Sequence, residues 1–196
     1  MKVMRIAVLA SGRGSNLQAL IDAQRSHRIN AEIVVVASDR HRAVALQIAA
    51  EARIDTVVLS PRDFDSRVAF DLALFARVAE YHPDLIVLAG YMRIVDPVAL
   101  VAWQGRIINI HPSLLPKYPG LDTHQRAIDA NDLEHGTSVH YVTAELDGGP
   151  VIAQARLVIQ ANDTPETLAA RLLPMEHELL VSTVAKLATV HSLAER

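Results

Sequence analysis

Cysteine is absent from this sequence of 196 residues. Disulfide bonds, thiolate metal sites and a cysteine nucleophile are therefore excluded. Long apolar runs are also missing: the first run, residues 6–10, is too short for the core of a signal peptide and leads directly into glycines. Because no run approaches the length that spans a bilayer, we expect a soluble cytoplasmic protein without a membrane partner.

An excess of positive charge is missing as well. The chain has 19 Lys and Arg against 22 Asp and Glu, for a net charge of -3. Proteins that bind nucleic acid usually carry a basic patch or stripe, so we expect no nucleic-acid partner. No low-complexity linker, charge block or internal repeat divides the chain. Its length suits a single domain with a sizeable core, which we expect to comprise residues 1–196.

Five short apolar runs recur before residue 111, and they are continuous instead of alternating with polar residues. Continuous runs rich in β-branched residues are typical of strands buried on both faces of a parallel sheet. The segments between them have the apolar spacing of helices, so the sequence predicts βαβ units. The expected strands are residues 6–10, 33–37, 56–59, 85–89 and 106–110, and the apolar helix positions are Leu17, Leu20, Ile21, Val44, Ile48, Ala49, Phe70, Leu74 and Val78.

The pattern changes after Pro112. Residues 113–123 contain prolines and a glycine, which predict an ordered loop. A helix is expected at 125–130, followed by two strands that are joined by a turn at Asp147-Gly-Gly-Pro150. The strands are expected at 137–142 and 151–159. A final helix is expected at 165–187, with a kink or break at Pro174.

A glycine-rich loop, Ser11-Gly-Arg-Gly-Ser-Asn16, joins the first expected strand to the first helix. Glycines let a backbone approach a ligand closely, and the N-terminus of a helix offers unpaired N–H groups and partial positive charge. Ser15 or Asn16 can cap the helix and bond an oxyanion as well. The loop therefore suits a phosphate, although an ordinary strand-to-helix turn without a ligand has the same sequence pattern.

A dinucleotide is the alternative ligand for this loop. The fingerprint for such a site is incomplete, because Gly12 and Gly14 are followed by Leu17 where the third glycine belongs. Asp39, at the end of the second expected strand, lies where a ribose-binding acid is found in dinucleotide sites. The loop also lacks the Lys-Ser/Thr ending of a nucleoside-triphosphate loop. A single phosphate fits better than either.

Asn109 and His111 stand two residues apart at the end of the fifth expected strand, so their side chains point to the same face. Pro112 cannot donate to a sheet and ends the strand. The two side chains are thus expected at the carboxyl edge of a parallel sheet, where ligands bind in open α/β folds. Asn can donate to a developing oxyanion, and His can move a proton near neutral pH.

Asp147 precedes two glycines and is most simply a turn-forming residue. Its alternative role is to orient His111 and favour the imidazolium. Sequence spacing alone does not decide between these roles. His135, His140, His111 and His124 raise the question of a metal site, but their spacing matches no zinc motif, so no metal is expected.

Five motifs together resemble phosphoribosylglycinamide formyltransferases, and the resemblance covers nearly the whole chain. The Asn-x-His-Pro-Ser-Leu-Leu-Pro motif is shared with other folate-dependent formyl enzymes, whereas the early glycine loop combined with Lys117-Tyr-Pro-Gly120 is more specific. The family usually has a small or polar residue at the position of Arg13 and often an acid at that of Ala144. The five motifs are residues 11–16, 88–94, 109–120, 135–140 and 145–150.

The resemblance implies the formyltransferase fold: an α/β, Rossmann-like, mostly parallel twisted sheet with helices on both faces and a C-terminal antiparallel hairpin. It implies a phosphate-binding half at about 1–105 and a catalytic, folate-binding half at about 106–196. It also implies a cis peptide between Leu115 and Pro116. The assembly is expected to be a monomer or a homodimer.

The resemblance further implies formyl transfer from 10-formyltetrahydrofolate to the amine of 5-phosphoribosylglycinamide, a step of purine synthesis that needs no metal. Asn109, a protonated His111 and Asp147 are the implied catalytic groups. Gly14, Ser15 and Asn16 would hold the phosphate and Glu176 the ribose. The implied folate-binding residues are Arg67, Met92, Arg93, Ile94, Val95, Asn109, Ala144, Glu145, Leu146 and Asp147.

Three other functions share parts of this pattern. A deformylase that hydrolyses the same folate has the same catalytic groups, but such enzymes usually carry an additional N-terminal domain. An initiator-tRNA formyltransferase has an additional C-terminal domain for RNA. A non-catalytic nucleotide-binding module would keep the glycine loop but has no need of Asn109, His111 and Asp147 together.

Overall fold

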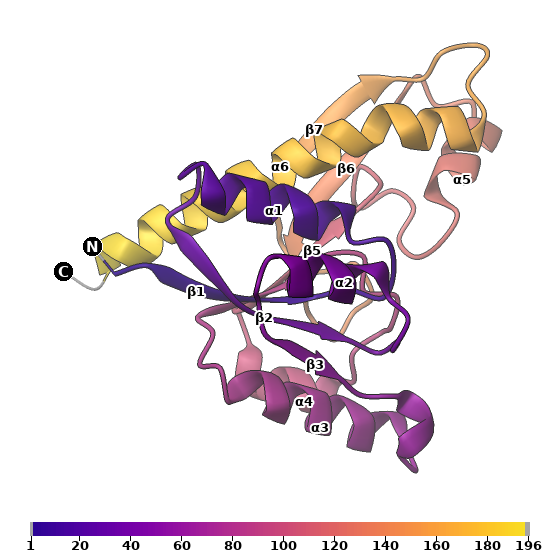
Figure 1. The fold of residues 1–196 in the computed structure, drawn as a ribbon. Helices are drawn as coiled ribbons and strands as arrows, with labels where there is room; N and C mark the ends of the chain where they lie inside the picture. The colour runs from indigo at the N-terminus through magenta and orange to yellow at the C-terminus, as the bar shows by residue number, and fades with distance from the viewer. Residues whose placement is uncertain (1, 195–196) are drawn as a thin grey trace.

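The computed structural model describes residues 2–194, in which seven strands form one mixed sheet (Figure 1). The strand order is β3-β2-β1-β4-β5-β6-β7. Strands β1 to β5 run parallel, whereas β6 is antiparallel to β5 and β7 to β6, which confirms the predicted fold class. The strands are β1 (Met4–Leu9), β2 (Ala31–Ser38), β3 (Thr56–Val58), β4 (Leu85–Leu88), β5 (Ile107–His111), β6 (Glu134–Tyr141) and β7 (Val151–Val158).

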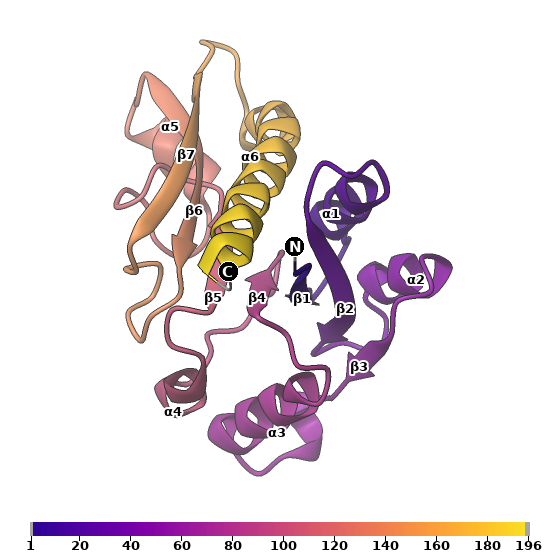
Figure 2. The ribbon, with the colours of Figure 1, turned by 90° about the vertical axis from the view of Figure 1, so that its left-hand side faces the viewer.

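Helices cover both faces of the sheet. Figure 2 shows α1, α2 and α6 on one face and α3 and α4 on the other. The α-helices are α1 (Ser15–Arg25), α2 (Val44–Glu51), α3 (Arg67–Ala79), α4 (Pro97–Leu100), α5 (Thr123–Asp129) and α6 (Pro165–Ala194). Two short 3-10 helices, η1 (Pro61–Asp63) and η2 (Val101–Trp103), were not predicted, and neither was α4.

Alternate residues of the central strand β1 supply the two halves of the core. Ile6 and Val8 pack with the α1 and α6 side chains, and Leu9 packs with Phe70 of α3. All four side chains are fully buried. Strands buried on both faces need apolar residues at every position, which is why these segments read as continuous runs.

Two details of the helices differ from the expectation. The helix α6 continues through Pro174, so the chain does not break there, and the flanking turns bury Leu172 and Leu180. Val44 is exposed, because α2 turns Ala45 and Ala49 toward the sheet instead. In addition, none of the helices described is long and apolar enough to cross a membrane.

The connections place three loops at one edge of the sheet. The chain leaves β1, β4 and β5 at their carboxyl ends, and these strands are neighbours in the order β1-β4-β5. From β3 the chain crosses to the far side of β1, so the order of strands reverses between β1 and β4. Ligands of open α/β sheets bind outside the carboxyl ends at such a reversal.

Candidate active site

A cavity of about 520 Å³ opens at this edge. Its walls come from the loops that follow β4, β5 and β6 and from the start of α5. Its lining surface is mainly apolar, and the polar groups on it include Asn109, His111 and Asp147. The lining includes residues 90–95, 109–112, 120–124, 140 and 142–147.

Strand β5 delivers Asn109 and His111 to the cavity, as the sequence predicts. The strand ends at His111, directly before Pro112. Asn109 is paired with Leu88 of β4 on one side and with His140 of β6 on the other. His111 is buried, and its Nε2 lies 2.9 Å from the carbonyl oxygen of Tyr118, to which it donates.

Asp147 reaches the same two side chains from the β6–β7 turn. Its Oδ2 lies 3.4 Å from His111 Nδ1, and its Oδ1 lies 3.5 Å from Asn109 Nδ2. The backbone N–H of Gly120 donates to Oδ2 at 2.8 Å. Asp147 has a φ of 50°, a left-handed conformation that Asp tolerates better than most residues. The structure therefore brings Asn109, His111 and Asp147 together, which sequence spacing alone did not predict.

The environment sets the charges of this group. Burial lowers the pKa of His111, and this effect outweighs the opposing influence of the Tyr118 carbonyl and the Asp147 carboxylate. Burial acts to raise the pKa of Asp147, but contacts with His140, Gly120 and His111 together outweigh it and the pKa is lowered. Asp147 is thus a carboxylate at neutral pH. Burial thus favours the neutral imidazole of His111 in the free protein, and the protonated His111 expected during the reaction stays a prediction.

His140 is a member of this group that sequence reasoning considered only as a metal ligand. Its Nε2 lies 3.2 Å from Asn109 Nδ2 and 3.5 Å from Asp147 Oδ1, and its Nδ1 lies 2.9 Å from the Tyr141 carbonyl oxygen. The side chain is buried. The signal that identifies it is the antiparallel register of β5 and β6, which sets Asn109 opposite His140. Strand prediction alone does not supply that register.

The glycine loop has the predicted backbone geometry. Gly14 has a φ of 75°, and a Cβ at this position would lie 2.8 Å from Ala45 Cα, so the loop requires glycine here. Ala45 N donates to the carbonyl oxygen of Gly12 at 3.1 Å, which fixes the loop to α2. The helix α1 starts at Ser15 with Gly14 as its N-cap and no side-chain cap, so the expected capping by Ser15 or Asn16 is wrong. Its first N–H groups therefore lie where the sequence places a phosphate.

Glu176 of α6 lies next to this loop, as the sequence resemblance implies. Burial raises the pKa of Glu176 to about 7, while a hydrogen bond with Asn16 and the charge of Arg13 act in the opposite direction. None of Gly14, Ser15, Asn16 and Glu176 lines the cavity described above. The structure thus separates the expected phosphate and ribose groups from the expected folate pocket.

The loop after β4 forms one wall of the cavity. Met92 and Ile94 are 61% and 53% exposed, which makes them available to an apolar ligand, whereas Val95 is buried. Arg93 stacks over the Phe70 ring, with its guanidinium carbon 5.0 Å from the ring centroid. On the opposite wall lie residues 144–147. Nine of the ten expected folate-binding residues therefore line this cavity.

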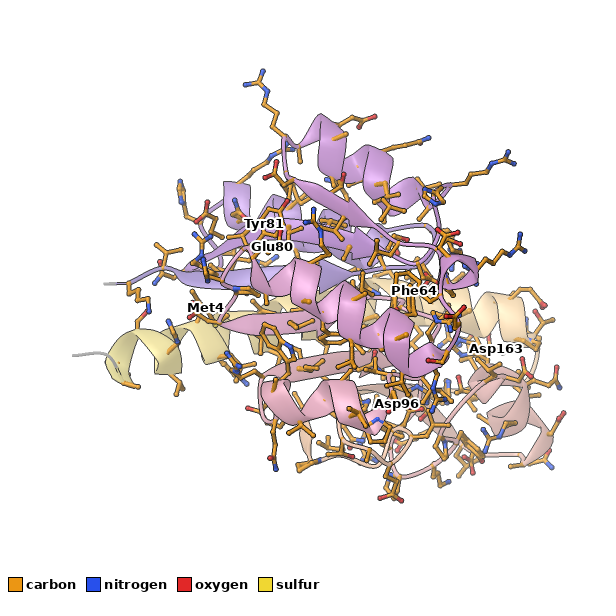
Figure 3. All side chains as sticks on the ribbon, turned by 90° about the horizontal axis from the view of Figure 1, so that it is seen from below. Met4, Phe64, Glu80, Tyr81, Asp96 and Asp163 are labelled. Atoms are coloured by element: carbon orange, nitrogen blue, oxygen red, sulfur yellow. The ribbon has the colours of Figure 1, made fainter. Side chains whose placement is uncertain are left out.

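Arg67 is the expected folate-binding residue that does not line the cavity. Its guanidinium pairs with Asp96 Oδ2 at 3.0 Å. Asp96, labelled in Figure 3, also caps α4 by accepting from Val98 N at 3.0 Å. The Arg67 and Val98 contacts lower the pKa of Asp96. Arg67 thus supports the end of the β4 loop in the free protein.

Further polar groups lie in α5 and β6, after the loop that follows β5. The Leu115–Pro116 peptide is cis, as predicted. His124 Nδ1 lies 3.0 Å from His135 Nε2. Burial lowers the pKa of His135 to about 4 and also lowers that of the partly buried His124, so this pair is uncharged at neutral pH. Within residues 2–194, no group of three or more His, Asp or Glu side chains could hold a metal ion.

Comparison with known proteins identifies the family. Residues 4–184 match the model of the Formyl transferase family. The chain is 49% identical to phosphoribosylglycinamide formyltransferase of Escherichia coli (strain K12), over 90% of this chain and 83% of that protein. It is 45% identical to the Haemophilus influenzae protein of that name, over 89% and 82%. The structure resembles glycinamide ribonucleotide transformylase 1 from Symbiobacterium toebii, with a TM-score of 0.93, 43% identity and coverage of 95% and 88%. The chain belongs to the phosphoribosylglycinamide formyltransferase family and is a formyltransferase.

Proposed function

We propose that the protein transfers the formyl group of 10-formyltetrahydrofolate to the amine of 5-phosphoribosylglycinamide. The products are formylglycinamide ribonucleotide and tetrahydrofolate, in the synthesis of purines. The observation that carries the proposal is the convergence of Asn109, His111 and Asp147 in a mainly apolar cavity. The family and the names of the relatives support the same reaction.

The folate supplies a formyl group on nitrogen, and its carbonyl oxygen gains negative charge as the amine attacks. Asn109 is the donor suited to that charge. Its Nδ2 carries two hydrogens, one close to His140 at 3.2 Å and one facing Asp147 at 3.5 Å. The second contact is long for a hydrogen bond, so an incoming oxygen replaces it at little cost. A preorganised amide donor of this kind is worth about 10²–10³ in rate.

His111 and Asp147 move the proton. A neutral His111 can take the proton that the attacking amine loses, and the Asp147 carboxylate stabilises the resulting imidazolium from 3.4 Å. The same proton then passes to the folate nitrogen as the C–N bond breaks. Protons therefore balance between the two substrates, with no covalent bond to the protein and no metal in the scheme. His111 starts this sequence of steps as the neutral imidazole because burial lowers its pKa.

The two substrates are assigned to the two regions that the fold separates. Gly14, Ser15 and Asn16 would bind the phosphate through backbone and side-chain donors, with Glu176 at the ribose. The mainly apolar cavity walls at 92–95 and 144–147 would hold the planar pterin, with Arg67 recruited as well. The reaction then depends on holding both substrates in register at Asn109 and His111.

One assay tests this proposal. Purified protein is incubated with 10-formyltetrahydrofolate in the presence and absence of 5-phosphoribosylglycinamide, and tetrahydrofolate and formylated product are both measured. We expect equal amounts of the two products, and only when the acceptor is present. Release of formate without acceptor would instead indicate the deformylase activity. No turnover under either condition would indicate the non-catalytic alternative.

The setting of the reaction is part of the same proposal. We propose a cytoplasmic enzyme that acts as a single domain on small molecules, as a monomer or homodimer, without nucleic acid or membrane. The net charge of -3 is compatible with this setting. Sedimentation of the purified protein distinguishes the monomer from the homodimer.

A further inference from the structure

Ser11 connects the glycine loop to the loop that follows β4. It is the first residue of the glycine loop and is only 2% exposed. Its backbone N–H donates to the carbonyl oxygen of Gly90 at 3.0 Å. Its side-chain Oγ accepts from the backbone N–H of Met92 at 2.9 Å. One residue of the proposed phosphate loop thus holds two points of the proposed folate loop.

We propose that Ser11 is a positioning residue that fixes the folate loop, residues 90–95, to the phosphate loop, residues 11–16. The inference rests on the proposed function, because it takes these loops as the sites of the two substrates. Ser11 touches neither of the groups assigned to proton transfer, His111 and Asp147, in any contact described above. Its role is therefore to set the distance between the two substrate sites.

The position of Ser11 in the sheet explains why a connection is needed there. The parallel ladder between β1 and β4 ends with Ala89 N donating to Leu9 O at 2.9 Å. Gly90 then takes a φ of 76°, which turns the chain out of the strand direction. Beyond this turn, strand pairing no longer holds the two segments together. The Ser11 bonds continue the attachment past the end of the ladder.

The far end of the folate loop is held by a different buried side chain. Asp71 of α3 is fully buried, and its Oδ2 accepts from Asp96 N at 2.8 Å. The loop is thus fastened at both ends, to α3 on one side and to the phosphate loop on the other. The Ser11 end joins the two substrate sites. Loss of the Ser11 hydroxyl should therefore disturb the binding of both substrates.

Three variants test the hydroxyl. Ser11→Ala removes the acceptor for Met92 N–H, and Ser11→Thr keeps it. The matched control is Ser38→Ala: Ser38 is fully buried at the end of the neighbouring parallel strand β2, and its Oγ bonds to the backbone of Arg40, two residues along the chain. Circular dichroism checks that each variant folds. If Ser11→Ala does not fold, Ser11→Cys replaces it, because a thiol is a weak acceptor.

Two measurements are made on each variant. The first is the steady-state KM for each substrate, and the second is hydrogen exchange at the Met92 amide without substrates. Loss of a part-buried hydrogen bond such as that between Met92 N–H and Ser11 Oγ is equivalent to roughly a 2- to 13-fold change in an equilibrium. We expect Ser11→Ala to raise both KM values and to speed Met92 exchange by factors in this range. Ser11→Thr should restore most of each loss, and Ser38→Ala should stay within about twofold of wild type.

The outcomes separate this inference from the proposed function. The inference is overturned if Ser11→Ala leaves Met92 exchange within twofold of wild type, if only one KM changes, or if Ser38→Ala has the same effect. If the wild-type protein transfers no formyl group, the proposed function fails. The connection between the loops is then judged by Met92 exchange alone, where a rate unchanged in Ser11→Ala again rejects it.

Discussion

The glycine loop after β1 and the polar group at the end of β5 lie at the same edge of one sheet but are built differently. The glycine loop depends on backbone: a left-handed Gly14, the free N–H groups at the start of α1 and a contact with α2. The group at β5 depends on side chains, with Asn109, His111 and Asp147 supplied by two separate segments. Backbone geometry does not titrate, whereas two of these three side chains do.

Because the two regions are built differently, substitutions in them should have different measurable effects. Damage to the glycine loop is steric and should appear in stability and in binding of one substrate. Damage at β5 removes charge or a hydrogen bond, and should appear in rate and in its dependence on pH. A substitution that changes only stability and binding, or only the rate and its pH dependence, would support this difference between the two regions. A substitution that changes both together would contradict it.

The largest effect is expected at Asp147. In Asp147→Asn the carboxylate that favours a protonated His111 is lost, so the pKa of His111 should fall further below its usual value. We expect the single-turnover rate to fall by about 10²–10⁴ while both substrates still bind. Rates are measured against pH, and His111 is followed by NMR titration. The control is thermal stability, which should change little.

The double variant decides whether Asp147 acts through His111. If the two residues work as a unit, Asp147→Asn combined with His111→Ala should be little worse than the worse single variant. Fully additive losses, or an unchanged His111 titration in Asp147→Asn, would mean that Asp147 only orders the Gly120 segment that donates to it.

The second prediction concerns Gly14. A Cβ there would lie 2.8 Å from Ala45 Cα and would require a side chain at a φ of 75°. We expect Gly14→Ala to lower the free energy of unfolding by about 2–4 kcal/mol and to raise KM for the phosphorylated acceptor more than for the folate. Gly12→Ala is the matched control, because nothing lies within 4 Å of a Cβ at that position. Equal losses in the two variants, measured by urea unfolding, would contradict the steric explanation.

Glu176 should produce a smaller effect that depends on pH. Its pKa of about 7 in the folded protein lies above the usual 4.5, so between these values the folded state holds a proton that the unfolded state has lost. Stability contributed by the protonated group is therefore lost as pH rises through about 7. We expect Glu176→Gln to gain about 1–3 kcal/mol relative to wild type between pH 5 and 8. Glu178→Gln, at an exposed site of the same helix, is the control, and a parallel gain there would reject the assignment.

The smallest effect is expected at Arg13, which is exposed in the phosphate loop and acts electrostatically on Glu176. Arg13→Asn should raise KM for the phosphorylated acceptor about 2- to 5-fold at low ionic strength. The increase should shrink near 1 M salt, where charges are screened within about 3 Å. Arg25→Gln, at the far end of α1, should leave this KM unchanged. A salt-independent increase would mean that Arg13 acts by shape instead of charge.

The sequence predicted correctly those features that depend on the residues of one continuous segment. The continuous apolar runs predicted the parallel strands, and the Asn109–His111 spacing predicted two side chains on one face of β5. It could not predict contacts that depend on register or on packing between distant segments. The pairing of Asn109 with His140 follows from β5–β6 register, and the lowered pKa of His111 follows from burial. The unbroken α6 at Pro174 is a case in which tertiary packing outweighs local preference.

The long helix α6 also bears on how the chain folds during synthesis. The side chains of α6 complete the core on one face of β1. Near the end of the helix, Ser192 Oγ donates to the Lys2 carbonyl oxygen at 3.0 Å, so α6 covers the sheet beside the first strand of the chain. Figure 1 shows the start of β1 and the end of α6 near each other. Translation proceeds at about 5–20 residues per second, so Leu180 follows Ile6 by roughly 10–35 s. During that interval the α6-facing side of β1 has no partner from α6, and the growing chain exposes an apolar surface on which aggregation can begin.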